Sequence, residues 1–160
     1  MPNCNIHDSY MNIAYEISKR SYANRLKVGA ILVKDNSIIS DGYNGMPYGF
    51  DNLCEKDNTT NIEVLHAESN AIAKIAKSNQ SSENSTLYVT TSPCVECSKL
   101  IIQCGIKIVY FDKRYRNLNG VYLLQRAAIK VFEKDHVDNV FYEFMKWKIN
   151  LCNVLNFNKK

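Results

Sequence analysis

The sequence has no apolar run of the about 20 residues that a membrane-spanning helix requires. Its first ten residues also lack the basic and then apolar arrangement of a secretory signal. The charge is only slightly unbalanced, at +4, with lysine and arginine scattered along the chain. Such a charge suits a small anionic ligand and is too weak to indicate a nucleic-acid groove. We therefore expect a cytoplasmic protein that needs neither a membrane nor a nucleic acid as partner.

Glycine and proline are scarce, with six and three residues, and the chain has no internal repeat or low-complexity tract. At 160 residues it is long enough to bury the core of one domain. Its six cysteines, in the absence of an export signal, are better explained as thiols or metal ligands than as disulfides. The sequence thus indicates a single domain over 1–160.

The apolar pattern predicts alternating helices and strands. Helices are expected over 8–22, 63–77, 95–105, 119–129 and 137–151. Strands are expected over 28–33, 37–44, 86–91, 106–111 and 130–132, with a long polar loop over 45–61. The first two strands form a hairpin, and the later units imply right-handed crossovers and parallel pairing. We expect an α/β fold of three layers (α/β/α), with about five strands in a mixed central sheet and the C-terminal helix packed on it.

Two short motifs indicate the chemistry: His66-Ala67-Glu68 and, further along the chain, PCVEC, which contains Cys94 and Cys97. His66 falls in the first turn of one predicted helix, and the two cysteines bracket the first turn of another. Thiolates three residues apart at a helix start lie on one side of the helix, where its dipole also favours them. One histidine and two cysteines leave the fourth tetrahedral position of zinc open, as in a catalytic rather than a structural site.

Glu68 lies two residues from His66 and is not needed as a ligand. Zinc lowers the pKa of its bound water from 15.7 to about 7, and a neighbouring carboxylate can take that proton and pass it on. Taken alone, the CxxC motif also fits a redox pair or half of a zinc ribbon, and His-Ala-Glu also fits an ordinary helix start. No second CxxC is present to complete a ribbon. The two motifs together therefore predict one catalytic zinc.

H-x-E followed by P-C-x-x-C is the known signature of zinc deaminases. From about Asn12 to Phe132 the chain resembles the zinc-dependent cytidine deaminase superfamily and, within it, the deoxycytidylate (dCMP) deaminases. The narrower resemblance rests on RLKVGAILV, GYNGMPYGF, HAESNAI, TTSPCVECSKLIIQCGIKIVYF and YRN, of which GYNGMP discriminates best. Deaminases of the free nucleoside are similar to one another in having cysteine at the position of His66. The resemblance thus implies a cytidine-deaminase-like fold and a nucleotide substrate.

The resemblance also implies a reaction, the hydrolytic deamination of dCMP to dUMP with release of ammonia. The three ligands named above would hold one Zn²⁺ per chain, and the hydroxide bound to it would attack C4 of cytosine. Glu68 would carry a proton to N3 and then to the leaving amine. The Ala67 N–H and the Ser92 carbonyl would hold the edge of the pyrimidine.

Four further residues have both a role in this resemblance and an ordinary interpretation. Asn44 would contact the deoxyribose, but asparagine before glycine is also a common turn dipeptide. Tyr115 would stack on the base, or it is simply a partly buried tyrosine. Arg25 and Arg116 are candidates for the 5′-phosphate because arginine makes bidentate contacts with phosphate, although most arginines only cover the surface.

Members of the family are typically activated by dCTP and inhibited by dTTP, commonly as homohexamers with Mg²⁺ bound to the triphosphate. The resemblance places this allosteric pocket at Gly42, Tyr43, Asn44 and Gly45. Glycine suits such a place because a backbone without Cβ lets a nucleotide approach closely.

Some relatives carry a second, structural zinc that uses a cysteine near the end of the first helix. This chain has Ala23 in that region, although Cys54 remains as a possible partner. Cys4 and His7 can add at most two ligands, from a terminus that is prone to fraying. We therefore expect no second zinc.

Three alternatives remain open at this stage. A nucleic-acid deaminase of the tRNA adenosine type shares both motifs, but it needs a basic surface for its substrate, which the weak charge and GYNGMP argue against. A non-enzymatic zinc module would not need Glu68. A deaminase that also accepts dCTP is the third.

Overall fold

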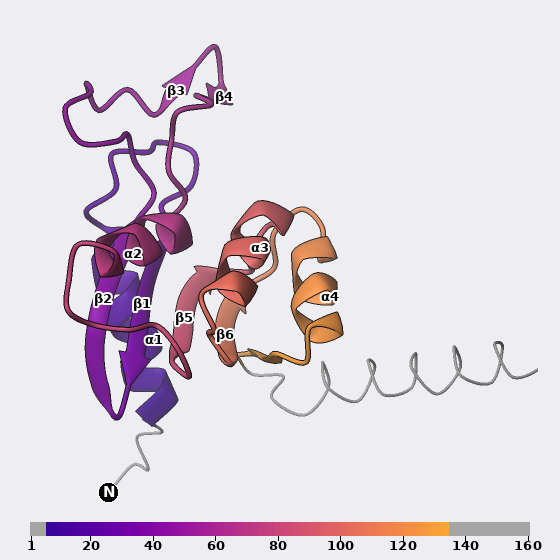
Figure 1. Cartoon of the computed structure of the whole chain (residues 1–160). Helices are drawn as coiled ribbons and strands as arrows, with labels where there is room; N and C mark the ends of the chain where they lie inside the picture. Colours follow the sequence, from indigo (N-terminus) through magenta and orange to yellow (C-terminus); the bar gives the residue numbers. More distant parts are fainter. Residues whose placement is uncertain (1–5, 135–160) are drawn as a thin grey trace, which may run out of the picture.

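The computed structural model describes residues 6–134 (Figure 1). Its helices are α1 (Ile6–Ser18), α2 (Ala67–Ile75), α3 (Val95–Gln103) and α4 (Asn119–Arg126). Its central sheet is made of β1 (Gly29–Lys34), β2 (Ser37–Tyr43), β5 (Thr86–Thr91), β6 (Ile108–Lys113) and β7 (Lys130–Glu133). A separate small hairpin is made of β3 (Glu55–Lys56) and β4 (Thr59–Thr60). The helix expected over 137–151 lies outside the described residues.

The central sheet is mixed, with the strand order β2-β1-β5-β6-β7. β1 pairs antiparallel with β2 and with β5, whereas β5–β6 and β6–β7 are parallel pairs. Each parallel pair is connected through a helix, first α3 and then α4, as parallel pairing requires. The expected five-stranded mixed sheet is therefore confirmed.

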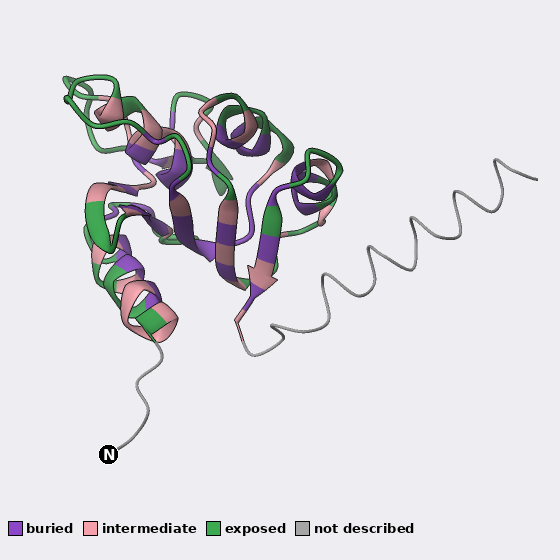
Figure 2. Cartoon of the chain, turned by 60° about the horizontal axis from the view of Figure 1, so that its bottom comes forward, coloured by how far each residue is buried: buried purple, intermediate pink, exposed green. Residues whose placement is uncertain are grey.

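Helices cover both faces of this sheet. Leu32, Val89 and Phe111 are buried in the core that the sheet forms with α2, α3 and α4. Ile31 and Tyr88 point to the opposite face, where α1 packs. Because β1 is covered on both faces, its apolar residues form a continuous run rather than an alternating one. Figure 2 shows the buried residues concentrated where the helices meet the sheet, which confirms the three expected layers. No helix within residues 6–134 is long and apolar enough to cross a membrane.

The expectation of a simple loop over 45–61 is wrong in part, because this stretch contains β3 and β4. The turn between them is Asp57-Asn58, with φ angles of +49° and +58°. The same pair, Asp35-Asn36, turns the chain between β1 and β2 with the same φ values. Long β-branched runs flank Asp35-Asn36 in the sequence. The strands β3 and β4, of two residues each, are too short to show such runs. The turn residues were therefore the only available signal of the small hairpin.

All four described helices are shorter than expected. At α1 and α2, contacts with neighbouring chain explain where the helix stops or starts. After α1, the Ser21 hydroxyl donates to the Asn44 carbonyl at 2.7 Å and ties the chain to the end of β2. Before α2, Leu65 exchanges two backbone hydrogen bonds with Gly45, of 2.9 and 3.1 Å. Residue 63, where the helix was expected to begin, lies instead in a turn that precedes this bridge.

Residues 46–64, here called the insert, form a lobe above one end of the sheet that includes β3 and β4 (Figure 1). A small apolar cluster of Ala23, Cys54 and Val64, with Met46 packed against it, joins the insert to the chain that follows α1. Ala23 and Cys54, the two positions considered for a second zinc, thus contribute to one apolar cluster.

At Gly42, in β2, the backbone of helix α2 packs directly against the strand. A Cβ at this position would lie 2.2 Å from the Ala67 carbonyl oxygen and 2.5 Å from the Ala71 backbone nitrogen. Both atoms belong to the helix backbone and cannot move aside as a flexible side chain would. The missing Cβ of Gly42 is therefore needed for the packing of α2.

Gly42→Ala is expected to lower the free energy of unfolding by about 3 kcal/mol, the upper end of the cost of overpacking a core. Urea unfolding followed by circular dichroism measures this. Gly45→Ala is the matched control, because a Cβ there would only contact the Tyr43 ring at 3.5 Å. Equal stability of the two variants would show that α2 can shift freely over the sheet.

Candidate metal centre and pocket

Helices α2 and α3 begin next to each other on the same face of the sheet. The residue at each start is an N-cap with extended backbone: His66 for α2, with φ −73° and ψ 157°, and Cys94 for α3, with φ −74° and ψ 171°. The Cys94 sulfur accepts a hydrogen bond from the Cys97 N–H at 3.5 Å. His66 thus lies immediately before the first turn of α2 and not within it, as the sequence had suggested.

The three predicted ligands come together. His66 Nδ1 lies 3.5 Å from both Cys94 Sγ and Cys97 Sγ, and all three atoms lie within 4.8 Å of one another. Tetrahedral zinc with a Zn–N bond of about 2.1 Å and Zn–S bonds of about 2.3 Å would separate nitrogen from sulfur by about 3.6 Å. Among residues 6–134 no other group of three such side chains could hold a metal ion. The donor set and its spacing therefore fit zinc.

Cys94 is prepared for metal binding by its neighbours. Hydrogen bonding from the Cys97 thiol and then from His66 lowers the pKa of Cys94 to about 3. Since the thiolate is the form that binds metal, this lowering of the pKa favours metal binding at the Cys94 sulfur.

Glu68 lies in the first turn of α2 and is only 3% exposed. Burial raises the pKa of its carboxyl group, an effect that its own backbone N–H and the His66 ring oppose. A carboxyl group with a raised pKa is well suited to accept a proton and release it again near neutral pH. The structure thus places a buried carboxyl group beside the predicted metal ligands.

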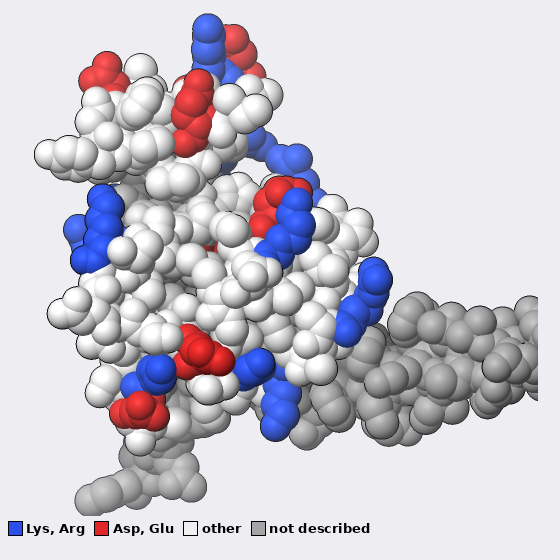
Figure 3. Space-filling view, in the orientation of Figure 1, with Lys and Arg blue, Asp and Glu red and all other residues white. Residues whose placement is uncertain are grey.

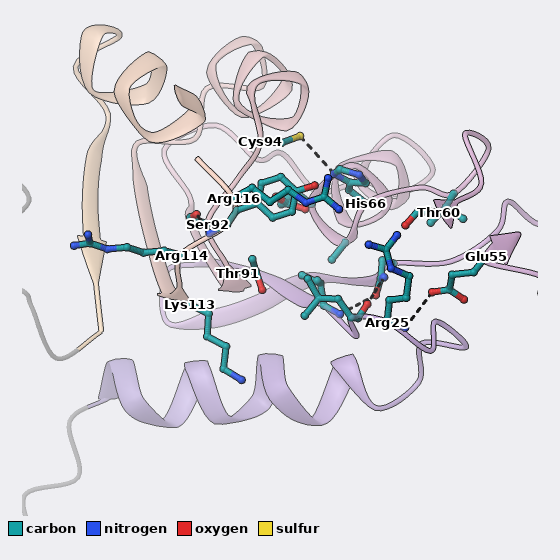
Figure 4. A pocket seen from close by; sticks show the side chains of 17 residues that line it. Arg25, Glu55, Thr60, His66, Thr91, Ser92, Cys94, Lys113, Arg114 and Arg116 are labelled. Carbon is teal, nitrogen blue, oxygen red and sulfur yellow. Dashed lines mark hydrogen bonds between the residues drawn. The ribbon is translucent and has the colours of Figure 1, made fainter. Parts of the chain in front are cut away.

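These residues lie in a pocket of about 420 Å³. Its volume is within the range of small-molecule sites. His66, Ala67, Glu68 and Cys94 line it at the helix starts. Its other sides are lined by Arg25, Leu26, Val28, Asn44, Glu55, Thr60, Val64, Thr91, Ser92, Lys113, Arg114, Tyr115 and Arg116 (Figure 4). The predicted catalytic and substrate residues therefore all reach one pocket, together with two of the three metal ligands.

Asn44 lines this pocket and also binds the backbone of residues 24–28, here called the 24–28 segment. Its Oδ1 accepts the N–H of Val28 at 2.8 Å, and its Nδ2 donates to the Leu26 carbonyl at 2.8 Å. Asn44 thus holds the neighbouring 24–28 segment, a structural role that differs from the turn that the sequence suggested. A side-chain amide has a second N–H and a second lone pair, so these contacts do not use all of its hydrogen-bonding capacity.

Tyr115 and Ser92 are linked directly, because the Ser92 hydroxyl accepts the Tyr115 N–H at 2.8 Å. The Arg116 guanidinium carbon lies 5.9 Å from the centre of the Tyr115 ring. In Figure 4 the Arg25 and Arg116 side chains extend into the pocket from opposite sides. The two predicted phosphate contacts therefore face a common space.

Eight pocket residues were not predicted from the sequence: Leu26, Val28, Glu55, Thr60, Val64, Thr91, Lys113 and Arg114. Glu55 and Thr60 belong to the hairpin that the sequence reasoning did not predict. Lys113 ends β6 and Arg114 follows it, so the rule that ligands bind beyond the carboxyl ends of parallel strands could have found them. Lys113 points toward α1 (Figure 4), with its ammonium 5.8 Å from the Tyr15 ring centre, and Arg114 forms an ion pair with Glu133 at 2.8 Å.

Of the four residues expected to bind an effector, only Asn44 lines the pocket. The Tyr43 ring lies 5.1 Å from the Arg20 guanidinium carbon and 6.0 Å from the Lys74 ammonium, and both cations also approach Asp41.

On the face shown in Figure 3, basic and acidic side chains are interspersed rather than gathered into a basic surface.

Comparison with known proteins gives a consistent match. Residues 4–113 match the family described as the cytidine and deoxycytidylate deaminase zinc-binding region. Deoxycytidylate deaminase of Enterobacteria phage T4 is 32% identical in an alignment of 166 positions, which covers 76% of this chain and 86% of that protein. The ComE operon protein 2 of Bacillus subtilis is 37% identical over 111 residues, which cover 67% of this chain but only 59% of that protein. This chain therefore matches less than two thirds of the Bacillus protein.

A solved structure matches along most of the fold. The crystal structure of dCMP deaminase from the cyanophage S-TIM5, in complex with dCMP and dUMP, superimposes with a TM-score of 0.79 at 44% sequence identity. The match covers 83% of this chain and 99% of that one.

Proposed function

The chain belongs to the cytidine and deoxycytidylate deaminase zinc-binding family, and on that premise we propose that it hydrolyses dCMP to dUMP and ammonia. One observation supports this most strongly: the three metal ligands and the buried Glu68 lie in or beside one pocket, into which two arginines extend. The phage T4 and cyanophage relatives, named as deaminases of dCMP, support the choice of substrate.

Zinc, when bound by His66, Cys94 and Cys97, supplies an activated water for attack on the cytosine ring. Glu68 takes the proton of that water and transfers it to N3 and then to the leaving amine, a role that suits a buried carboxyl group. The pyrimidine edge is held by the Ala67 N–H and the Ser92 carbonyl. Because Ala67 is the first residue of α2, its N–H has no partner within the helix and is available to the ligand.

The remaining pocket residues select the nucleotide. Tyr115 stacks on the base, and the Ser92 hydroxyl, which accepts the Tyr115 N–H, fixes its backbone. Asn44 contacts the deoxyribose through the part of its amide that the 24–28 segment does not use. Arg25 and Arg116 bind the 5′-phosphate from two sides, since guanidinium groups pair with phosphate oxygens.

Regulation is proposed at Gly42, Tyr43, Asn44 and Gly45, with dCTP as activator, dTTP as inhibitor and Mg²⁺ on the triphosphate. The two cations beside Tyr43, from Arg20 and Lys74, support binding of an anionic effector there. Asn44 follows Tyr43 and also lines the pocket, so it connects the effector segment to the substrate.

A homo-oligomer, with a hexamer as the proposed state, is supported by the large apolar side chains that the insert exposes. Tyr48, Phe50, Leu53 and Ile62 are each more than 60% exposed. Exposed apolar groups of this size, close together in the chain, are typical of a surface that a further subunit covers.

An ammonia-release assay on dCMP, CMP, dCTP and deoxycytidine, each with and without added dCTP or dTTP, tests the proposal. We expect kcat/KM for dCMP to exceed that for deoxycytidine by about 100-fold, because charge-assisted contacts to phosphate contribute about 1.5–3 kcal/mol each. Arg25→Ala and Arg116→Ala should each remove part of this preference, whereas Arg126→Ala, at an exposed position of α4, should not. A preference for deoxycytidine would contradict the phosphate assignment, and turnover unaffected by either triphosphate would contradict the regulation.

A further inference from the structure

The 24–28 segment forms one side of the pocket although it belongs to no helix or strand. Arg25, Leu26 and Val28 of this segment line the pocket. The position of the Arg25 guanidinium therefore depends on a stretch of chain that no regular hydrogen-bond ladder fixes. Backbone groups of such a stretch need other partners, from side chains or from water.

Glu55, in β3 of the insert, supplies these partners at the start of the segment. Its carboxylate accepts the N–H of Asn24 at 3.0 and 3.2 Å and the N–H of Arg25 at 3.3 Å. Figure 4 shows the Glu55 side chain directed to the backbone that carries Arg25. Hydrogen bonds from N–H groups to a carboxylate are charge-assisted and stronger than those between neutral groups.

Asn44 supplies partners at the other end of the segment. Besides the two contacts of its side chain to Leu26 and Val28, its backbone N–H donates to the Val28 carbonyl at 3.2 Å. Arg25 thus lies between two points that are fixed by side chains distant in sequence. Of these two, only Glu55 binds the Arg25 backbone directly.

A carboxylate beside a phosphate pocket would repel the ligand if its charge faced the phosphate. The Glu55 oxygens face backbone N–H groups instead, so the negative charge is partly compensated there. We propose that Glu55 is a positioning residue, which fixes the Arg25 guanidinium for the 5′-phosphate and so contributes to the choice of nucleotide over nucleoside. This inference rests on the proposed function and adds a residue to its specificity.

The test compares Glu55→Ala and Glu55→Gln with the wild type, using dCMP and deoxycytidine as substrates. For Glu55→Ala we expect KM for dCMP to rise about tenfold, near the low end for lost charge-assisted hydrogen bonds. The value of kcat for dCMP, and kcat/KM for deoxycytidine, should stay within about twofold, because the chemistry at the zinc is unchanged. Glu55→Gln keeps the size of the side chain and one acceptor oxygen, so KM for dCMP should rise less than in Glu55→Ala.

A double-mutant cycle separates positioning from general damage. In an Arg25→Ala background the Glu55→Ala change should alter KM for dCMP by less than about twofold, since the group that it positions is gone. Glu63→Ala, an exposed glutamate of the same insert, is the matched control and should leave KM unchanged.

Two results would overturn the inference while the proposed function stands: an unchanged KM for dCMP in Glu55→Ala, or an equal loss with deoxycytidine. The inference would also be overturned if Glu55→Ala raised KM for dCMP about tenfold in the Arg25→Ala background. If the wild type releases no ammonia from dCMP, the proposed function fails separately. Calorimetric titration of the wild type and of Glu55→Ala with dUMP and with deoxyuridine then decides the role of Glu55. A loss of affinity for dUMP but not for deoxyuridine in the variant supports this role. An affinity for dUMP equal to that of the wild type refutes it.

Discussion

Glu68→Gln is expected to slow deamination of dCMP by about 10³-fold, within the range that general acid–base catalysis contributes. Glutamine keeps the size of the side chain, so the buried first turn of α2 should stay packed. It cannot take a proton from water and return it to the leaving amine. We therefore expect kcat to fall while KM for dCMP and the zinc content stay near their wild-type values, as measured by ammonia release and by elemental analysis.

Glu96→Gln is the matched control for this change. Glu96 also lies in the first turn of a helix, α3, but its side chain is 78% exposed and pairs with Lys99 on the surface. We expect wild-type activity from this variant. If Glu68→Gln also kept activity within tenfold of the wild type, Glu68 would not be the proton carrier, and the catalytic interpretation of the site would fail.

Replacing either cysteine ligand is expected to have a second large effect, the loss of both zinc and activity. Cys97→Ser places a hydroxyl where the geometry requires a thiolate 3.5 Å from His66 Nδ1, and serine is not among the usual ligands of zinc. We expect the bound metal to fall from about one ion per chain to almost none, since three ligands are the minimum for a catalytic site. Elemental analysis and the ammonia assay measure the two losses on the same sample.

Thermal unfolding completes this test, because binding energy released by a metal adds to the stability of the fold that holds it. The Cys97→Ser variant and chelator-treated wild type should therefore show similarly lowered melting temperatures. Cys104→Ser is the control: Cys104 caps the end of α3, away from the ligands, and its replacement should leave zinc and activity in place. A Cys97→Ser variant with normal zinc would contradict the assignment of the metal site.

The metal site could be predicted from sequence because its rules are local. His66 and Glu68 are two residues apart, and Cys94 and Cys97 are three apart, so each pair is fixed by its own helix start. That the two starts meet follows from helices packing on one face of a sheet whose strands the apolar pattern also predicted. Short-range spacing together with the fold class was sufficient here.

The contacts around Arg25 could not be predicted in this way. Glu55 lies 30 positions along the chain from Arg25, and Asn44 lies 16 positions from Val28, without a motif that links either pair. Their pairing depends on where the insert folds back, and the short strands of its hairpin leave almost no periodic signal. The need for glycine at position 42 could not be predicted for the same reason. The atoms that a Cβ there would meet belong to the backbone of α2, which is distant in sequence.

The two hydrogen bonds between Gly45 and Leu65 have a consequence for protein engineering. They bring both ends of the insert together, so residues 46–64 form a loop that is closed at its base. The entropic cost of closing a loop rises by only about 0.6 kcal/mol for each doubling of its length. Lengthening or shortening the exposed part of the insert should therefore cost the sheet little, while the metal ligands and Glu68 lie outside it. Grafting other loops between Gly45 and Leu65 offers a way to change which substrates the pocket accepts without rebuilding its chemistry.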